Sequence, residues 1–137
     1  MLGCGRINYD LIEPPTAGDA ASDGPAVCPS DTLPITAGSK TCIEKVERGN
    51  MTWTDADAMC RAAGRSLCSD AQWLTACQQV PSLIDMFNDG NGATPEWEWV
   101  AEVMFDQGSK RGVGTCSDTA THEIFAMPYD FRCCVTI

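Results

Sequence analysis

The chain has 137 residues, nine cysteines and a formal net charge of −10. Its length suits one domain with a tail. The sequence contains no run of about 20 apolar residues, the length that a membrane-spanning helix requires. The absence of a basic cluster excludes a nucleic-acid partner, because phosphate binding requires lysines and arginines. The negative net charge disfavours direct attraction to anionic lipid. We interpret this charge as a contribution to solubility.

The cysteines indicate oxidised pairs rather than a metal site. Zinc sites use closely spaced ligand pairs such as C-x-x-C, which the sequence lacks, and His122 is the single histidine. Disulfides tolerate any spacing that the fold brings together, and they persist outside the reducing cytoplasm. We therefore predict an exported, disulfide-bonded, extracytoplasmic protein.

The segment Leu2-Gly3-Cys4 resembles the end of a bacterial lipobox, where the cysteine is diacylated and becomes the mature N-terminus. Setting Cys4 apart leaves eight cysteines, an even number that can pair completely. The charged and apolar regions of a signal peptide do not precede it, so the alternative is an accidental Leu-Gly-Cys after a cytosolic start codon. We predict lipidation at Cys4, attachment to the cell envelope, and contact with the membrane only through this anchor.

Residues 1–27 are predicted to form the lipobox remnant and a flexible tether. The stretch from residue 5 is small, acidic and rich in proline and glycine, so it cannot bury enough apolar surface to offset the entropy of ordering. The folded domain is predicted to cover residues 28–137. Its first clear strand is expected from Thr41, where apolar and polar residues begin to alternate.

An amphipathic helix is predicted after this strand. Thr52 or Thr54 can cap its start and Gly64 can end it, and its apolar positions recur at helical spacing at Trp53, Ala56, Cys60 and Ala63. A second helix is predicted from the capping box of Ser69 and Gln72. It carries Trp73, Ala76 and Cys77 on one side and ends before Pro81.

The remaining chain is predicted to be mostly strands. The segment 83–87 adds an apolar turn, and residues 88–92 form a loop rich in Asn, Asp and Gly. Three strands are expected at Glu96–Val103, Ser109–Cys116 and Asp130–Ile137. Two helices followed by short strands predict an α+β domain.

Several motifs resemble those of known families. The segment Cys28-Pro29 through Cys42, followed by the spacing from Trp53 to Leu67, looks like the first half of a long-form C-type-lectin-like domain. The segment Cys60–Trp73, Trp97-Glu98-Trp99 and the terminal Asp130-Phe131-Arg132-Cys133 are similar to motifs of the formylglycine-generating enzyme (sulfatase-modifying factor) family, which has the same general fold. The resemblance covers about residues 28–137. It implies a C-type-lectin-like fold, with two helices packed on short, mostly antiparallel strands and stapled by disulfides.

The resemblance also implies a disulfide map. It ties the N-terminal hairpin together, the first helix to the terminal strand, and the second helix to the region after the Trp-Glu-Trp strand. These three links leave Cys68 and Cys134 for the fourth, and alternation of side chains along a strand agrees with separate partners for Cys133 and Cys134. The four implied pairs are Cys28–Cys42, Cys60–Cys133, Cys77–Cys116 and Cys68–Cys134.

Active members of this family oxidise a substrate cysteine with two copper-binding thiolates, placed between the Trp-Glu-Trp strand and the terminal motif. Soft thiolates are the ligands that Cu(I) requires. Between Trp99 and Phe131 this chain has one cysteine, Cys116, so we expect the catalysis to be lost. Ergothioneine-type relatives use a histidine-based iron site, which His122 alone cannot form, and we assign it no role.

The family's calcium site falls on Asn91 and Glu98, with backbone carbonyls near Thr94 and Glu96. Calcium takes six to eight hard oxygen ligands of these kinds. The alternative is a turn-forming asparagine and a solvated strand glutamate, and Pro95 alters the family's spacing. No other cofactor is expected.

Three functional classes remain open. The first is a non-catalytic lipoprotein-type domain that binds a protein or carbohydrate, or has a structural role in the envelope. The second is a sulfatase-modifying oxidoreductase with its chemistry placed elsewhere. The third is a retroelement-diversified ligand-binding protein, which shares this fold.

Overall fold

Two helices and two sheets form the α+β fold of the computed structural model, which describes residues 27–83 and 97–137. One sheet has the strand order β1 (Thr32–Pro34), β2 (Thr41–Glu44), β9 (Cys133–Thr136) and β4 (Ser66–Leu67). The other has the order β3 (Arg48–Met51), β8 (Tyr129–Phe131), β5 (Glu98–Met104), β6 (Gln107–Arg111) and β7 (Thr119–Glu123). All neighbours are antiparallel except β5 and β8. The predicted α+β class is confirmed.

Both helices begin and end at the residues that the sequence predicts. Helix α2 (Trp53–Ala62) starts after Thr52, whose side chain accepts the Asp55 N–H. The chain leaves this helix through Gly64 at φ 70°, a left-handed conformation that glycine adopts without strain. Helix α3 (Asp70–Gln79) starts with a complete capping box, because Ser69 and Gln72 each accept the other's backbone N–H.

The core has two clusters, and the adjacent cysteines of β9 divide between them. Cys133 lies with Cys60, Trp99 and Phe131 in the cluster beneath α2. Cys134 lies in the cluster beneath α3, whose other buried members are Ile43, Cys68, Trp73, Ala76, Leu83 and Val100. Successive side chains of a strand point to opposite faces, so β9 separates the two clusters and contributes to both.

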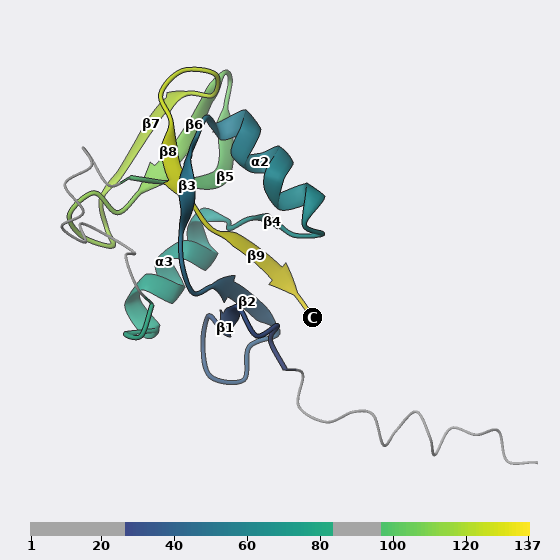
Figure 1. The fold of residues 1–137 in the computed structure, drawn as a ribbon. Helices are drawn as coiled ribbons and strands as arrows, with labels where there is room; N and C mark the ends of the chain where they lie inside the picture. The colour runs from purple at the N-terminus through teal and green to yellow at the C-terminus, as the bar shows by residue number, and fades with distance from the viewer. Residues whose placement is uncertain (1–26, 84–96) are drawn as a thin grey trace, which may run out of the picture.

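Two of the connections between the sheets pass directly from strand to strand, without an intervening helix. The chain leaves β2 for β3 through residues 45–47, and it leaves β8 for β9 at Arg132 (Figure 1). The predicted single strand Asp130–Ile137 is therefore wrong, because it is two strands in different sheets. Arg132 is fully buried, and its hydrogen bonds reach other parts of the chain.

The region after β5 also differs from the prediction. The expected strand Ser109–Cys116 ends at Arg111, because Gly112 turns the chain at φ 88°. The Asp118 side chain then accepts the N–H groups of Gly114 and Thr115 at 2.8 Å each. Strand β7 follows, and it was not predicted.

Four disulfides join these elements: Cys28–Cys42, Cys60–Cys133, Cys68–Cys134 and Cys77–Cys116. They are the same four pairs that the resemblance implied. Multiple disulfides are typical of proteins in oxidising, extracytoplasmic environments. In the part of the chain that the structure describes, neither helix is long and apolar enough to cross a membrane.

Candidate functional site

Glu98 is the residue of the predicted calcium site whose side chain lies within the described part of the chain. It begins β5 and is 1% exposed. One carboxylate oxygen accepts a hydrogen bond from Arg132 Nε at 2.8 Å, and the other accepts one from Trp73 Nε1 at 3.1 Å. Burial raises the pKa of Glu98 to about 7, although the Arg132 charge and both hydrogen bonds act in the opposite direction.

Arg132 connects Glu98 to the crossing from β2 to β3. Its Nη1 donates to the carbonyl oxygens of Glu44 and Lys45 at 3.1 and 2.7 Å. Glu47 follows in the same crossing, and its pKa is raised to about 9, first by burial and then by the negative charges of Glu98 and Asp130. We call the residues Glu44, Lys45, Glu47, Glu98, Asp130 and Arg132 the sheet junction.

Glu44 is the second buried carboxylate of the sheet junction. Its oxygens accept hydrogen bonds from Arg48 and Arg65, with shortest distances of 2.6 and 2.7 Å, and from the backbone N–H of Cys133 at 3.0 Å. Arg65 also pairs with Asp31 on the surface, and this contact lowers the pKa of Asp31. The sequence analysis missed this network, although the acidic and basic residues of 44–48 are visible in the sequence.

The described residues do not by themselves form the calcium site that the resemblance implies. Both oxygens of Glu98 have protein partners, and one partner is a guanidinium, which would repel a calcium ion placed beside it. No group of three or more Asp, Glu, His or Cys side chains suited to a metal ion occurs within residues 27–83 and 97–137. The calcium hypothesis therefore depends on Asn91 and on the carbonyls near Thr94 and Glu96, which lie outside the described residues.

Cys116 is bonded to Cys77 of helix α3. It is the only cysteine between Trp99 and Phe131 in the sequence, where the resembling enzymes place their copper-binding thiolates. A disulfide sulfur is not a thiolate, so Cys116 is not available for Cu(I) in this state. Of the nine cysteines, the one outside the four bridges is Cys4, which lies outside the described residues.

His122 contributes to packing. It lies partly buried on β7, and its ring is 6.1 Å from that of Tyr129, edge to face. The Tyr129 hydroxyl accepts a hydrogen bond from the buried Lys110 at 2.8 Å, and the Lys110 ammonium also lies over the Trp97 ring at 4.9 Å. These contacts place a cation among aromatic rings, which stabilises a buried lysine.

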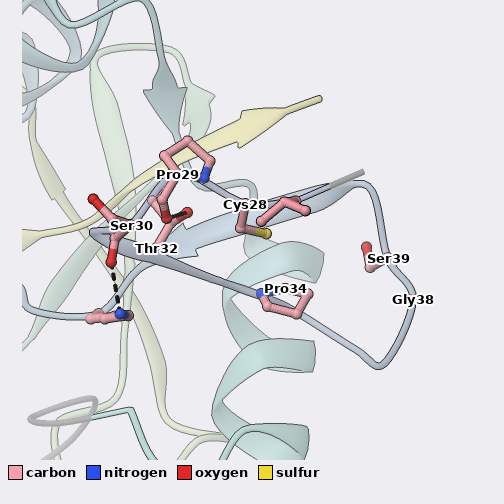
Figure 2. Close-up of a pocket in the computed structure, with 9 residues that line it drawn as sticks. Cys28, Pro29, Ser30, Thr32, Pro34, Gly38 and Ser39 are labelled. Carbon is pink, nitrogen blue, oxygen red and sulfur yellow. Dashed lines mark hydrogen bonds between the residues drawn. The ribbon is translucent and has the colours of Figure 1, made fainter. Parts of the chain in front are cut away.

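A shallow hollow lies beside the N-terminal hairpin. Its volume is about 460 Å³. Figure 2 shows Cys28 and Pro29 on one side and the Pro34–Ser39 turn on the other, with Lys45 donating a hydrogen bond to the Ser30 carbonyl at 2.7 Å. Its walls are mostly small residues and backbone, and its one charged side chain is Lys45, so it offers little to recognise a specific ligand.

Exposed apolar side chains gather at the β5–β6 turn and in the β7–β8 connection. Phe105 is 94% exposed and Phe125 73%, and Met104, Met127 and Val103 are also exposed. Single exposed apolar residues are ordinary, whereas several together mark interaction surfaces. The sequence analysis missed this surface, because aromatic residues in a sequence are more often buried than exposed.

No family model and no curated protein matches this chain. The resemblance to the formylglycine-generating enzyme family therefore stays a hypothesis based on the motifs quoted above.

Proposed function

We propose that this chain is a non-catalytic binding domain of the extracytoplasmic envelope, with the architecture of the formylglycine-generating enzyme and C-type-lectin-like families. The observation that carries the proposal is the bridge between Cys77 and Cys116. Copper-dependent oxidation in this family needs two thiolates, and this bridge occupies the one cysteine available in that region. An exposed apolar surface on a disulfide-stapled frame is suited to binding a partner.

The disulfides support the proposed location outside the cytoplasm. The anchor at Cys4 would hold the domain at the membrane, with residues 5–27 as the connection. The ligand class in this proposal is a protein or a carbohydrate.

Thiol titration of the folded protein tests the proposal. In a Cys4→Ser chain, no cysteine should react with a thiol reagent before denaturation and reduction. After both treatments, all eight remaining cysteines should react. Two reactive thiols in the folded protein would favour the oxidoreductase alternative instead.

An activity measurement completes the test. The domain is incubated with copper, oxygen and a cysteine-containing sulfatase peptide, and the peptide is weighed by mass spectrometry. The substrate cysteine should stay intact. Its conversion to the aldehyde with repeated turnover would overturn the proposal.

A further inference from the structure

The exposed apolar side chains described above lie at one end of the five-stranded sheet. Met104 ends β5 and Phe105 begins the β5–β6 turn, while Phe125 and Met127 belong to the β7–β8 connection. The Ile124 N–H donates to the Asp106 carbonyl at 3.0 Å, which joins the two loops. Figure 1 shows both loops together at the end of the molecule where α2 begins.

Neighbouring elements hold these loops in place. The Thr54 N–H and hydroxyl both donate to the Ile124 carbonyl at 3.3 Å, so the start of α2 fixes the β7–β8 connection. Trp53 donates from Nε1 to the Val100 carbonyl at 2.8 Å and packs on Gly108, where an added Cβ would lie 2.5 Å from the indole. A surface held in this way loses little entropy when it binds a partner.

Phe105 has an unusual backbone conformation for a large side chain. Its φ is 59°, in the left-handed region that glycine and asparagine favour. A bulky residue there costs on the order of 1 kcal/mol or more, and this one gains no burial in return. Strain that brings no packing gain is typical of functional positions.

A groove continues from these loops along α2. Its volume is about 630 Å³, and Met51, Met59 and Pro128 give it apolar walls, with Asp55 among its other lining residues. Pro128 follows Met127 directly, so the groove adjoins the β7–β8 connection. We call Met104, Phe105, Phe125, Met127, Pro128 and Met59 the loop-end surface.

The charges that border the loop-end surface are negative. Neither loop contains lysine or arginine, and Asp106 and Glu123 are exposed there, together with Asp55 in the groove. A second copy of this chain would complement them poorly, because each arginine that the structure describes already pairs with a carboxylate of its own chain, and Lys40 is the one exposed lysine among the described residues. Anionic lipid would be repelled.

We propose that the loop-end surface binds a segment of another protein that combines apolar side chains with lysines or arginines. The aromatic loops would supply the apolar contacts and the groove would hold the segment, while the acidic border would select for its positive charge. This inference rests on the proposed binding function and names its surface and partner class.

Selection from a random peptide library displayed on phage tests the inference. Enriched peptides are synthesised, and their Kd is measured by calorimetry with the full chain. They should combine apolar residues with Lys or Arg, and added salt should weaken their binding. Phe105→Ser and Phe125→Ser should each weaken binding about tenfold or more, as expected for central aromatic contacts.

Val46→Ser is the matched control. Val46 is also exposed, at 57%, but lies in the β2–β3 crossing, so its substitution should leave Kd unchanged. Thermal melting of all three variants checks that they fold.

Failure of the inference is distinct from failure of the proposed function. Peptides that bind Phe105→Ser and Phe125→Ser as tightly as the unmodified chain, or that lack basic residues, would overturn the inference about this surface. The proposal that the chain is a binding domain would still stand. A library that yields no binder would overturn the inference too. Two other results would also overturn the inference. One is binding to neutral phosphatidylcholine vesicles that Phe105→Ser or Phe125→Ser abolishes, and the other is a dimer in solution that either substitution abolishes. Reactive thiols in the folded protein would count against the proposed function itself.

Discussion

The guanidinium of Arg132 and the carboxylate of Glu98 form an ion pair that is almost completely buried, with 2.8 Å between Nε and Oε1. Arg132 lies where the chain passes from β8 to β9, and Glu98 begins β5. Because the same guanidinium binds the Glu44 and Lys45 carbonyls, it also holds the crossing from β2 to β3. This one side chain therefore joins the two direct strand-to-strand crossings between the sheets.

Substitution of Arg132 should be strongly destabilising. Arg132→Met leaves the Glu98 carboxylate buried beside Trp73 without its cation, and removal of one partner of a buried ion pair costs about 3–5 kcal/mol. Urea unfolding measures the loss. Arg61→Met is the control, because Arg61 forms an exposed pair with Asp57 and should cost less than about 1 kcal/mol. Equal losses in the two variants would contradict the role of the sheet junction.

The raised pKa of Glu47 predicts how stability depends on pH. Its pKa rises from 4.5 to about 9 on folding, so within that range the folded state binds more protons than the unfolded state. The free energy of unfolding should therefore fall as the pH rises from about 5 to about 9. Glu98, with a pKa of about 7, should contribute a fall in the same direction over the lower part of the range.

Glu47→Gln should make this pH dependence shallower. The amide carries no charge to be repelled by Glu98 and Asp130. Glu47 is partly exposed and solvent screens the repulsion, so we expect a gain on the order of 1 kcal/mol near pH 8 and none near pH 4. Thermal melting across the pH range measures both. An equally steep fall in the variant would show that Glu47 is not the group responsible.

The helices were predicted well because their signals are local. The capping box of Ser69 and Gln72 and the glycine at position 64 lie within a few residues of the helix ends they determine. Strand β7 was missed because its sequence, Thr-Ala-Thr-His-Glu, shows no alternation of apolar and polar residues. It lies at the edge of its sheet, where pairing with β6 decides the structure.

The sheet junction was beyond prediction from the sequence for a different reason. Arg132 is 34 residues from Glu98 and 88 from Glu44, and no local pattern indicates that these groups meet. The break of β8 and β9 at Arg132 depends on those contacts. Exposure of Phe105 is equally a tertiary property, because a sequence pattern does not show which aromatic residues remain uncovered.

The disulfides should contribute unequally to stability. Cys60–Cys133 spans 73 residues and Cys28–Cys42 spans 14, and a longer closed loop restricts the unfolded chain more. Replacement of the first pair by alanine should cost about 1.5 kcal/mol more than replacement of the second, with a further loss because Cys60 and Cys133 are fully buried. Denaturant unfolding compares them. Non-reducing peptide mapping checks the pairing, and a bond from Cys60 to any other cysteine would contradict this fold.

The predicted anchor at Cys4 can be tested in a bacterium. Expressed behind a complete signal peptide, the chain should incorporate labelled fatty acid and fractionate with membranes. Cys4→Ser should release it, since the domain has no other predicted contact with lipid. Fatty-acid label that persists in the Cys4→Ser protein would refute lipidation at this residue.

The predicted calcium site combines Glu98 of the sheet junction with residues outside that junction. If Asn91, Glu98 and nearby carbonyls bind the ion, added calcium should raise Tm, because an ion bound only by the folded state stabilises it by mass action. Asn91→Ala should remove the rise without touching the Arg132 pair. Glu98→Gln should remove it too, but will also lower Tm in the absence of calcium, so the calcium-induced shift is the quantity to compare. Magnesium is the control, since it demands tighter octahedral geometry and should have little effect. If Tm of the unmodified chain is the same after chelation and after calcium is restored, the site does not exist.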